Sequence, residues 1–583
     1  MKKTITKGVG LTLLLTIGSL ACKDSFLNVA PTGQLVGSLL NTKDGLEGLL
    51  ISAYAELNGR GYSQTSSPTN WMYGSIMGGD ANKGSNPADF SAITPFQTYL
   101  VNSVSSELNP RWQALYEGVS RANSVLRTIP TAVASVNDAI KQRIGGEARF
   151  LRGLYYFDLK RTFNMVPYID ETVDYGTGIT AVQNNVDIWP KIEADFKYAY
   201  DNLPETQTQA GRANKWAAAA YLARTYMYQK KYAEAKALFD LIIANGKTTN
   251  GKKYGLVPQY ANIFNVDNEN NEEAIFSTQN VANAGSTDVA SNDLNLNYPY
   301  SPGIGATCCG FFQPTFDLAN SYRTDATGLP LDVTLANGAY DRAENELKTD
   351  QGLAADAAYT PDTRPVDPRL DHSVGRRGIP YLDYGVFPGV TWIRDQAFGG
   401  PYSNKKYVFL LSQKDRVGDK SSWTTGWAST NVILLRYADV LLMAAEAEIE
   451  VGSLEIARSY TNQVRRRAAN PAGYVTTAAG QPAANYVISE YPASAFASQD
   501  AARATVRFER KLELSGEGQR FFDLVRWGVA APTLNAFLAY EKAKLPVAYA
   551  EANFVAGKNE YLPIPQTQID LQGTSVLKQN PGY

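Results

Sequence analysis

The sequence predicts a mainly α-helical fold, in which paired helices form a scaffold that carries a loop-rich region with short strands. Three observations predict this fold class. Apolar residues recur at spacings of three and four along several stretches before residue 247 and after residue 431. Two of these stretches consist of two helical patterns joined by a short turn. Residues 247–430 are instead rich in Gly, Pro, Asn and aromatic residues and contain few long helical periods.

The amino-terminal segment has the layout of a secretory signal peptide. Three lysines in the first seven residues precede an apolar run that ends at about Leu20, and this run is too short to cross a bilayer, which takes roughly 20 apolar residues. Small residues then lead into Cys22, as in the lipobox of bacterial lipoproteins, whose cysteine is acylated. We expect residues 1–21 to be removed and residues 22–41 to form a lipidated tether, because several acyl chains anchor a protein stably. The alternative is plain secretion with an incidental cysteine.

The first helical region is expected to span residues 42–246. Helical patterns cover residues 42–57, 109–130 and 143–163, each with an apolar stripe on one face. Residues 216–246 then fit two helices joined by a turn at about Gln229 to Lys231. The spacing of the tetratricopeptide pattern is matched by Leu222, Ala223, Tyr226, Tyr232, Ala235 and Phe239.

The second region, residues 247–583, is expected to be loop-rich over 247–430 and helical over 431–583. Residues 435–468 repeat the helix, turn, helix layout, with the turn at Gly452. Because Ala445 lies at a small-residue position like those of the first pair, we expect this pair to pack as closely.

One late helical pattern, residues 505–528, is rich in charges. Arg510 with Glu513, and Glu517 with Arg520, lie three residues apart. Such pairs usually lie on a solvent-exposed helix face, so we expect a salt-bridged surface there.

Composition excludes several function classes. Of 583 residues, 44% are hydrophobic and 19% charged, and the net charge is −2, so the chain lacks the basic excess typical of nucleic-acid binding. His372 is the only histidine, which argues against Ser-His-Asp chemistry and multi-histidine metal sites. We expect no cofactor and no metal, and a hydrogen-bonding role for His372. Two carboxylates acting on a glycosidic bond remain an alternative, for instance Asp80 and Asp395.

Two neighbouring cysteines, Cys308 and Cys309, remain besides Cys22. The sequence leaves two alternatives for them: two small buried side chains, or a disulfide between adjacent residues in an oxidising compartment.

Aromatic residues with polar neighbours gather in glycine-bearing loops. A sugar offers an apolar face and a rim of hydroxyl groups, so a sugar-binding site needs flat aromatic rings with hydrogen-bonding groups around them. The candidate ligand-binding residues are Asn70, Trp71, Tyr73, Asp80, Asn82 and Lys83 in the first loop, and Tyr298, Tyr300, Trp392, Trp423 and Trp427 in later loops. Aromatic residues within the helical patterns, such as Trp112 and Trp216, are expected to pack in the core.

Several stretches along the chain resemble the SusD/RagB family of outer-membrane nutrient-uptake lipoproteins. They include "GEARFLRGLYYFDLKRTFNMVPYI", "NKWAAAAYLARTYMYQKKYAEA", "DPRLDHSVGRRGIPY", "NVILLRYADVLLMAAEAEIE", "ERKLELSGEGQRFFDLVRWG" and the closing "YLPIPQTQIDLQGTSVLKQNPGY". The resemblance implies a SusD-like fold of tetratricopeptide-like helix pairs with a loop-rich region.

The resemblance also implies a role without catalysis. Members of the family hold oligosaccharides at the cell surface above a SusC-like, TonB-dependent outer-membrane transporter. The partners it implies are therefore an oligosaccharide, this transporter and the outer membrane, which the lipid anchor at Cys22 would reach. Peptide cargo is an alternative, because some relatives are associated with peptide uptake.

Overall fold

The computed structural model describes most of the chain after the expected tether. The described residues are 37–59, 61–286, 289–291, 293–301, 309–331, 346–421 and 426–583. The predictions for Cys22, Cys308 and Trp423 lie outside them.

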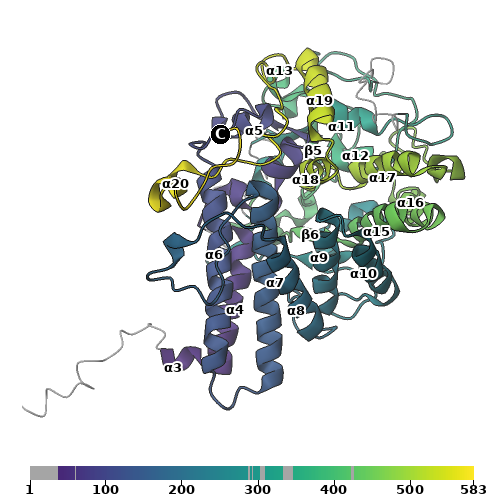
Figure 1. Ribbon diagram of the computed structural model, residues 1–583. Helices are drawn as coiled ribbons and strands as arrows, with labels where there is room; N and C mark the ends of the chain where they lie inside the picture. The colour runs from purple at the N-terminus through teal and green to yellow at the C-terminus, as the bar shows by residue number, and fades with distance from the viewer. Residues whose placement is uncertain are drawn as a thin grey trace, which may run out of the picture.

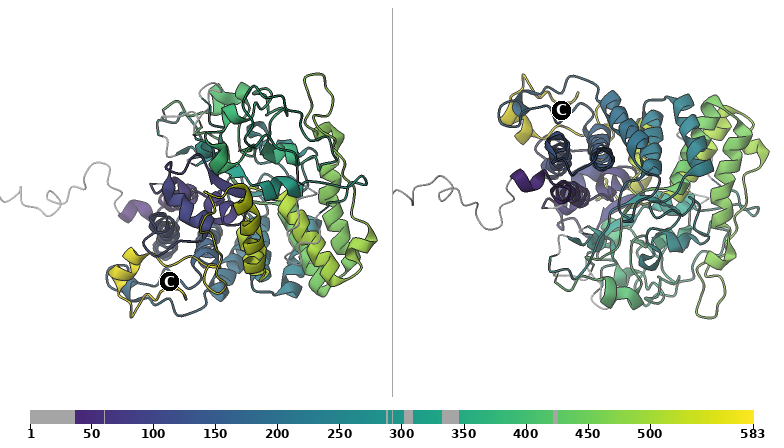
Figure 2. Two further views of the ribbon diagram at one scale, coloured as in Figure 1. Left: turned by 90° about the horizontal axis from the view of Figure 1, so that it is seen from above. Right: turned by 90° about the horizontal axis from the view of Figure 1, so that it is seen from below.

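One side of the molecule is a layer of helices that pack in succession. Figure 1 shows them side by side, and Figure 2 shows the loop-rich region, teal to green, on the opposite side. The layer consists of α4 (Lys43–Ala55), α6 (Leu108–Thr128), α7 (Asp138–Phe163), α8 (Trp189–Asn202), α9 (Lys215–Tyr228), α10 (Tyr232–Asn245), α15 (Tyr437–Val451), α16 (Leu454–Ala468) and α17 (Gln499–Glu513). The mainly helical fold is confirmed.

Both predicted helix pairs are present with their turns. Helix α9 ends at Tyr228 and α10 begins at Tyr232, as the spacing predicts. Helix α15 ends before Gly452, and the Ser453 side chain caps α16. Because α10 packs against α15, the two pairs form one continuous stack although about 190 residues separate them in sequence.

Two element boundaries differ from the expectation. Helix α7 begins at Asp138, five residues earlier than its apolar pattern, because the Asn137 side chain accepts a hydrogen bond from the Ile140 backbone N at 3.0 Å and caps the helix. Where helix was expected from about Val432, Ile433–Arg436 forms strand β6, which pairs antiparallel with β2 (Ala274–Ser277).

Within the described parts of residues 247–430, the helices and strands are short. Two other sheets pair β1 (Ala81–Gly84) with β3 (Phe311–Pro314) and β4 (Val374–Gly375) with β5 (Ser403–Asn404), both antiparallel. The remaining α-helices are α3 (Gly37–Leu40), α5 (Thr94–Thr98), α11 (Phe316–Ser321), α12 (Leu370–Ser373), α13 (Gln396–Gly399), α14 (Lys414–Val417), α18 (Arg520–Arg526), α19 (Ala530–Lys544) and α20 (Gln566–Gln572). None of the helices within the described residues combines the length and apolar character that a membrane crossing requires.

Three of the four charges expected on a helix surface have buried side chains, namely Arg510, Glu513 and Glu517, whereas Arg520 is half-buried. Glu513 is fully buried and pairs with Arg369 at 2.9 Å, with Arg436 at 2.6 Å and with Arg467. Arg510 is 2% exposed and pairs with Asp439 at 2.6 Å and with Asp523 at 3.0 Å. The prediction of a salt-bridged surface is therefore wrong for both Glu513 and Arg510. Helix α17 is covered by α15, α16 and the loop-rich region, so its polar face meets buried arginines instead of solvent.

This buried network is electrically balanced. It joins five basic and five acidic side chains, all at most 6% exposed: Arg369, Lys406, Arg436, Arg465, Arg467, Asp367, Glu273, Glu509, Glu513 and Glu517. Its members come from α16, from α17 and the segment that follows α17, from β6 and from the loop-rich region. Buried ion pairs therefore link the loops to the helical layer.

Candidate functional site

The first predicted binding loop, residues 70–83, lies in the core. The Trp71 side chain is 2% exposed, its indole N donates to the Gly516 carbonyl at 2.6 Å, and its ring lies 4.8 Å from that of Phe312. Tyr73 is 1% exposed and donates to the Glu107 carbonyl at 3.1 Å. Neither ring offers a face to solvent, so this burial argues against the predicted sugar-binding role of the loop.

The polar candidates of the same loop are bonded within the protein. Asn70 accepts a hydrogen bond from Arg111 at 2.6 Å, and Asn82 donates to the Gly399 carbonyl at 3.3 Å. Burial raises the pKa of Asp80 to about 6 and lowers the pKa of Lys83 to about 8. The run of large apolar residues around Trp71 was the sequence signal for this burial.

Two other predicted segments, those that contain Tyr300 and Trp392, meet at the surface beside α13. Tyr300 is 39% exposed, and its backbone N donates to the Trp392 carbonyl at 3.1 Å. The guanidinium carbon of Arg394 lies 4.9 Å from the centre of the Tyr300 ring. We call this group of residues the Tyr300 cluster. It consists of Tyr300, Trp392, Arg394, Ser85 and Asp89, and the last two are described next.

Arg394 is held in place by the loop after β1. Its Nη1 donates to the Ser85 hydroxyl at 3.0 Å and forms an ion pair with Asp89, to which Ser85 in turn donates at 2.7 Å. Arg394 and Asp89 are both about one-third exposed. The sequence singled out neither Ser85 nor Asp89. The Asn86-Pro87 turn signal marks their loop, but the pairing with Arg394 spans 305 residues.

A close backbone contact fixes the geometry of the cluster. Gly310 has a positive φ of 69°, donates to the Tyr298 carbonyl at 3.0 Å and accepts from the Ser85 backbone N at 2.6 Å. A Cβ on Gly310 would lie 3.1 Å from the Cβ of Tyr300. Glycine is therefore favoured here, where the end of the β1–β3 sheet brings Ser85 and Tyr300 together.

The other aromatic candidates lie in or beside a small hydrophobic cluster. Tyr298 is fully buried against Phe409, so it offers no ligand surface. Trp392 is half-buried, with its ring 5.4 Å from that of Phe387. Trp427 is also half-buried and precedes Ala428 of the same cluster. Trp392 and Trp427 thus remain accessible in part.

Several predicted chemical groups have structural roles instead. The His372 imidazole lies within 2.7 Å of the Gly473 carbonyl, and burial lowers its pKa to about 4, which confirms its hydrogen-bonding role. Cys309 is disulfide-bonded, and its partner lies outside the described residues. Among the residues that the structure describes, no group of three or more His, Cys, Asp or Glu side chains could hold a metal ion.

The hypothetical pair of catalytic carboxylates does not fit the geometry. Asp80 is 1% exposed, and the Asp395 side chain caps α13 by accepting from the Phe398 backbone N at 3.1 Å. A buried carboxyl cannot meet a polymeric substrate, so we discard this pair as a catalytic centre.

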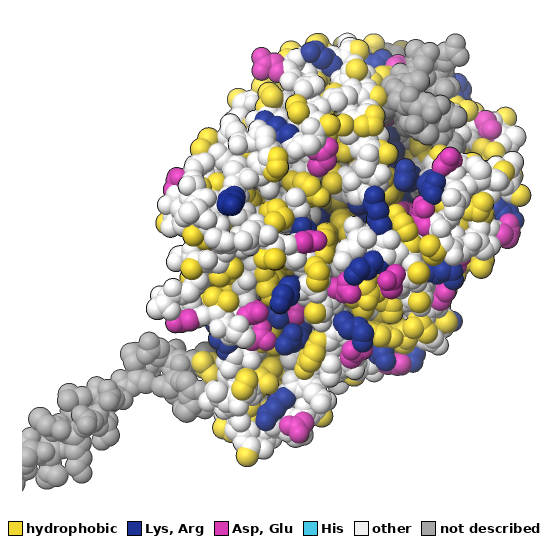
Figure 3. Space-filling view, viewed as in Figure 1, with side chains coloured by type: hydrophobic (Ala, Val, Ile, Leu, Met, Phe, Trp, Pro, Cys, Tyr) yellow, Lys and Arg dark blue, Asp and Glu magenta, His cyan; other side chains and the backbone are white. Residues whose placement is uncertain are grey.

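A concave surface lies at the end of α4. This groove of about 470 Å³ runs between α4 and the segment after β2, and its lining includes Ile51, Tyr54, Arg212, Gln279 and Val281. Its size suits a small ligand. The sequence singled out none of these residues. On the face of the molecule turned to the viewer in Figure 1 and Figure 3, basic and acidic side chains are interspersed rather than gathered by sign.

Comparison with known proteins assigns the family. The family model described as "SusD family" matches residues 272–583, and the one described as "Starch-binding associating with outer membrane" matches residues 25–227. A SusD-like protein of Bacteroides ovatus is 28% identical over 52% of this chain and 55% of its own length. SusD-like protein P2 of Formosa agariphila is 26% identical over 81% of this chain and 80% of its own length. The starch-binding protein SusD of Bacteroides thetaiotaomicron is 26% identical over 77% and 74%.

Solved structures share the fold at low sequence identity. A SusD superfamily protein from Bacteroides vulgatus has a TM-score of 0.66 and 20% identity, over 93% of this chain and 99% of the other. Surface glycan-binding protein A from Bacteroides thetaiotaomicron, in complex with laminarihexaose, has a TM-score of 0.62 and 22% identity, over 92% and 99%. With one family model spanning more than half of the sequence and the same fold in these structures, the chain belongs to the SusD family.

Proposed function

We propose that this protein is a non-enzymatic surface lipoprotein that captures oligosaccharides and delivers them to a SusC-like, TonB-dependent outer-membrane transporter. The observation that carries the binding role is the Tyr300 cluster, where an exposed aromatic ring, a guanidinium group and a carboxylate from three distant segments meet at the surface. The family descriptions and the laminarihexaose complex of a structural neighbour support a carbohydrate ligand.

The cluster suits a sugar chemically. The Tyr300 ring can stack on the apolar face of a pyranose, while Arg394 donates to hydroxyl groups and Asp89 accepts from them. Trp392 adds partly exposed aromatic surface beside it. Since Arg394 is already oriented by Ser85 and Asp89, little side-chain entropy is lost when a ligand binds.

We expect the protein to bind a glycan from a panel of starch, laminarin and other polysaccharides in affinity gels without releasing reducing ends. Tyr300→Ala and Trp392→Ala should each weaken that affinity at least about tenfold, as calorimetry would measure, because each removes stacking surface. Tyr226→Ala, at a half-buried tyrosine of α9, is the matched control and should bind normally.

Four outcomes would contradict this assignment in whole or in part. Unchanged affinity in both variants would remove the Tyr300 cluster from the site. A loss confined to Gln279→Ala would place the ligand in the α4 groove instead. Released reducing ends would contradict a purely binding role, whereas retention of peptides alone would change the cargo and keep the uptake role.

The proposed anchor has its own test. Labelled palmitate should be incorporated into the full chain in a bacterial host that processes lipoproteins, and Cys22→Ala should abolish incorporation, because the thiol of Cys22 is the proposed acylation site. Cys309→Ala is the control. Because Cys309 is disulfide-bonded, we do not expect it to be acylated, and its substitution should leave labelling unchanged. Labelling that persists in Cys22→Ala would contradict lipidation at Cys22.

A further inference from the structure

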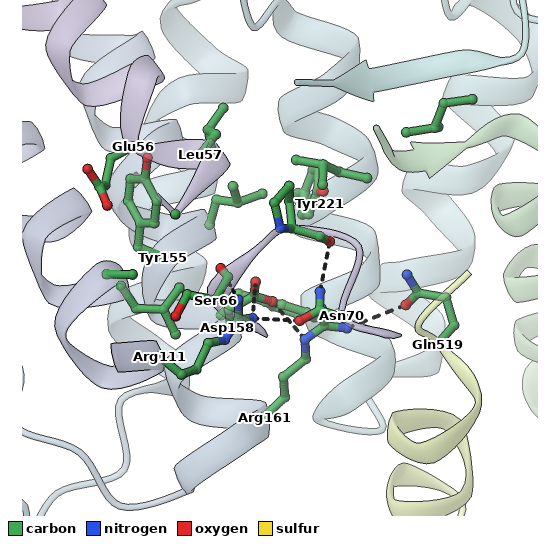
Figure 4. Close-up of a pocket in the computed structure, with 18 of the residues that line it drawn as sticks. Glu56, Leu57, Ser66, Asn70, Arg111, Tyr155, Asp158, Arg161, Tyr221 and Gln519 are labelled. Carbon is green, nitrogen blue, oxygen red and sulfur yellow. Dashed lines mark hydrogen bonds and ion pairs between the residues drawn. The ribbon is translucent and has the colours of Figure 1, made fainter. Parts of the chain in front are cut away.

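A small cavity lies between the helical layer and the loop at residues 66–70. Its volume is about 40 Å³, far below the roughly 300 Å³ of small-molecule sites but enough for a small inorganic ion. Figure 4 shows Glu56 and Tyr155 towards one end and Arg111, Arg161 and Gln519 towards the other. The cavity is therefore lined by charged and polar side chains as well as apolar ones, with most of its labelled donors at one end.

Three buried arginines line this cavity. Arg111, Arg161 and Arg224 are 1%, 6% and 4% exposed. Asp158 pairs with Arg111 at 3.1 Å and with Arg161 at 2.7 Å. Among the described residues, Arg224 donates to the amide oxygen of Gln519 alone, and this oxygen also accepts from Arg161 at 3.4 Å. One carboxylate thus faces three guanidinium groups.

The other carboxylates of the lining already have partners. Glu56 pairs with Arg121 at 3.2 Å, and Glu517 belongs to the balanced buried network through Lys406 and Arg436. Across the described part of the chain, no carboxylate lies within ion-pair distance of Arg224. Buried positive charge without a counter-charge is costly.

Unused hydrogen-bond donors are found in the same place. The Nε of Arg111 is buried without a partner among the described residues, and so is the hydroxyl group of Ser66, which lines the cavity and is 3% exposed. Buried donors normally have acceptors. Both the charge and the donors therefore require an acceptor that carries a negative charge.

From this geometry we infer that the cavity is a structural site for a small inorganic anion of halide size. The anion accepts hydrogen bonds from Arg111, Arg224 and Ser66. Its negative charge offsets the positive charge of the three arginines that Asp158 alone does not balance. The anion fastens α6, α7 and α9 to the 66–70 loop and to Gln519, before α18. This role does not depend on glycan binding.

Crystals of the protein soaked in sodium bromide test the site. We expect an anomalous bromide peak in the cavity, within hydrogen-bonding distance of Arg111 and Arg224. In solution, the unfolding temperature should rise and then level off with added chloride or bromide, but not with gluconate at equal ionic strength, since gluconate is too large for the cavity.

Variants test whether the rise in unfolding temperature comes from halide bound in this cavity. Arg224→Met should raise the halide concentration needed for half of the temperature shift at least about tenfold, whereas Arg466→Met, at a half-exposed surface arginine, should leave it unchanged. If Arg224→Met does not fold, the presence or absence of the anomalous bromide peak in crystals of the unaltered protein decides whether the cavity binds an anion. A cavity without an anomalous peak, or equal stabilisation by gluconate, would overturn the inference and leave water as the occupant.

Discussion

Replacing Glu513 with alanine is expected to lower the free energy of unfolding by about 3–5 kcal/mol, the usual effect of removing one partner from a buried ion pair. Glu513 is fully buried and faces Arg369, Arg436 and Arg467. Its loss leaves a net positive charge in a network that is otherwise balanced. Urea denaturation followed by circular dichroism would measure the change.

A surface ion pair provides the matched control. Glu490 pairs with Arg466 at 2.8 Å, and both side chains are about half exposed. Because solvent screens such a pair, Glu490→Ala should change the free energy of unfolding by less than about 1 kcal/mol. Equal effects of the two substitutions would contradict the energetic role assigned to the buried network.

The deficit of the Glu513 variant should also depend on pH. Burial by itself would raise the pKa of Glu513, but Arg467, Arg436 and Arg369 outweigh burial and hold the pKa well below its usual range. A depressed carboxyl pKa stabilises the folded state above the unfolded pKa of about 4.3, and this stabilisation is lost as the pH falls through the folded value. The difference between Glu513→Ala and the unaltered protein should therefore be largest at neutral pH and narrow below about pH 4.

The second large effect is expected at Gly74. A Cβ on Gly74 would lie 1.9 Å from the carbonyl oxygen of Gly518, so two backbone segments must separate to admit it. We expect Gly74→Ala to lower the free energy of unfolding by about 1–3 kcal/mol or more, the cost of overpacking a core that cannot give way. Thermal unfolding would show the loss.

At another glycine, substitution by alanine is expected to change the free energy of unfolding in the opposite direction. Gly48 lies on the exposed face of α4, and nothing beyond its own stretch of helix lies within 4 Å of the position that a Cβ would take. Gly48→Ala should therefore stabilise the protein by up to about 1 kcal/mol through helix propensity. A neutral or stabilising Gly74→Ala would contradict the close approach of residues 74 and 518.

Local patterns in the sequence were enough for the helical scaffold. The turn between α9 and α10, and the turn at Gly452, follow from periodicity and small residues within about 30 positions. The family could also be identified from the sequence, because its motifs are contiguous stretches of chain.

The tertiary structure alone decided which aromatic and charged residues reach solvent. Trp71 and Tyr300 both stand in glycine-bearing loops, yet Trp71 is 2% exposed and Tyr300 39%. Burial depends on partners far along the chain, such as Gly516 for Trp71. Likewise, Glu513 has the spacing of a surface charge and meets arginines from three other segments. Periodicity predicts which residues share one face of a helix or strand. It does not predict whether another segment covers that face, because contacts between distant segments depend on how the elements pack.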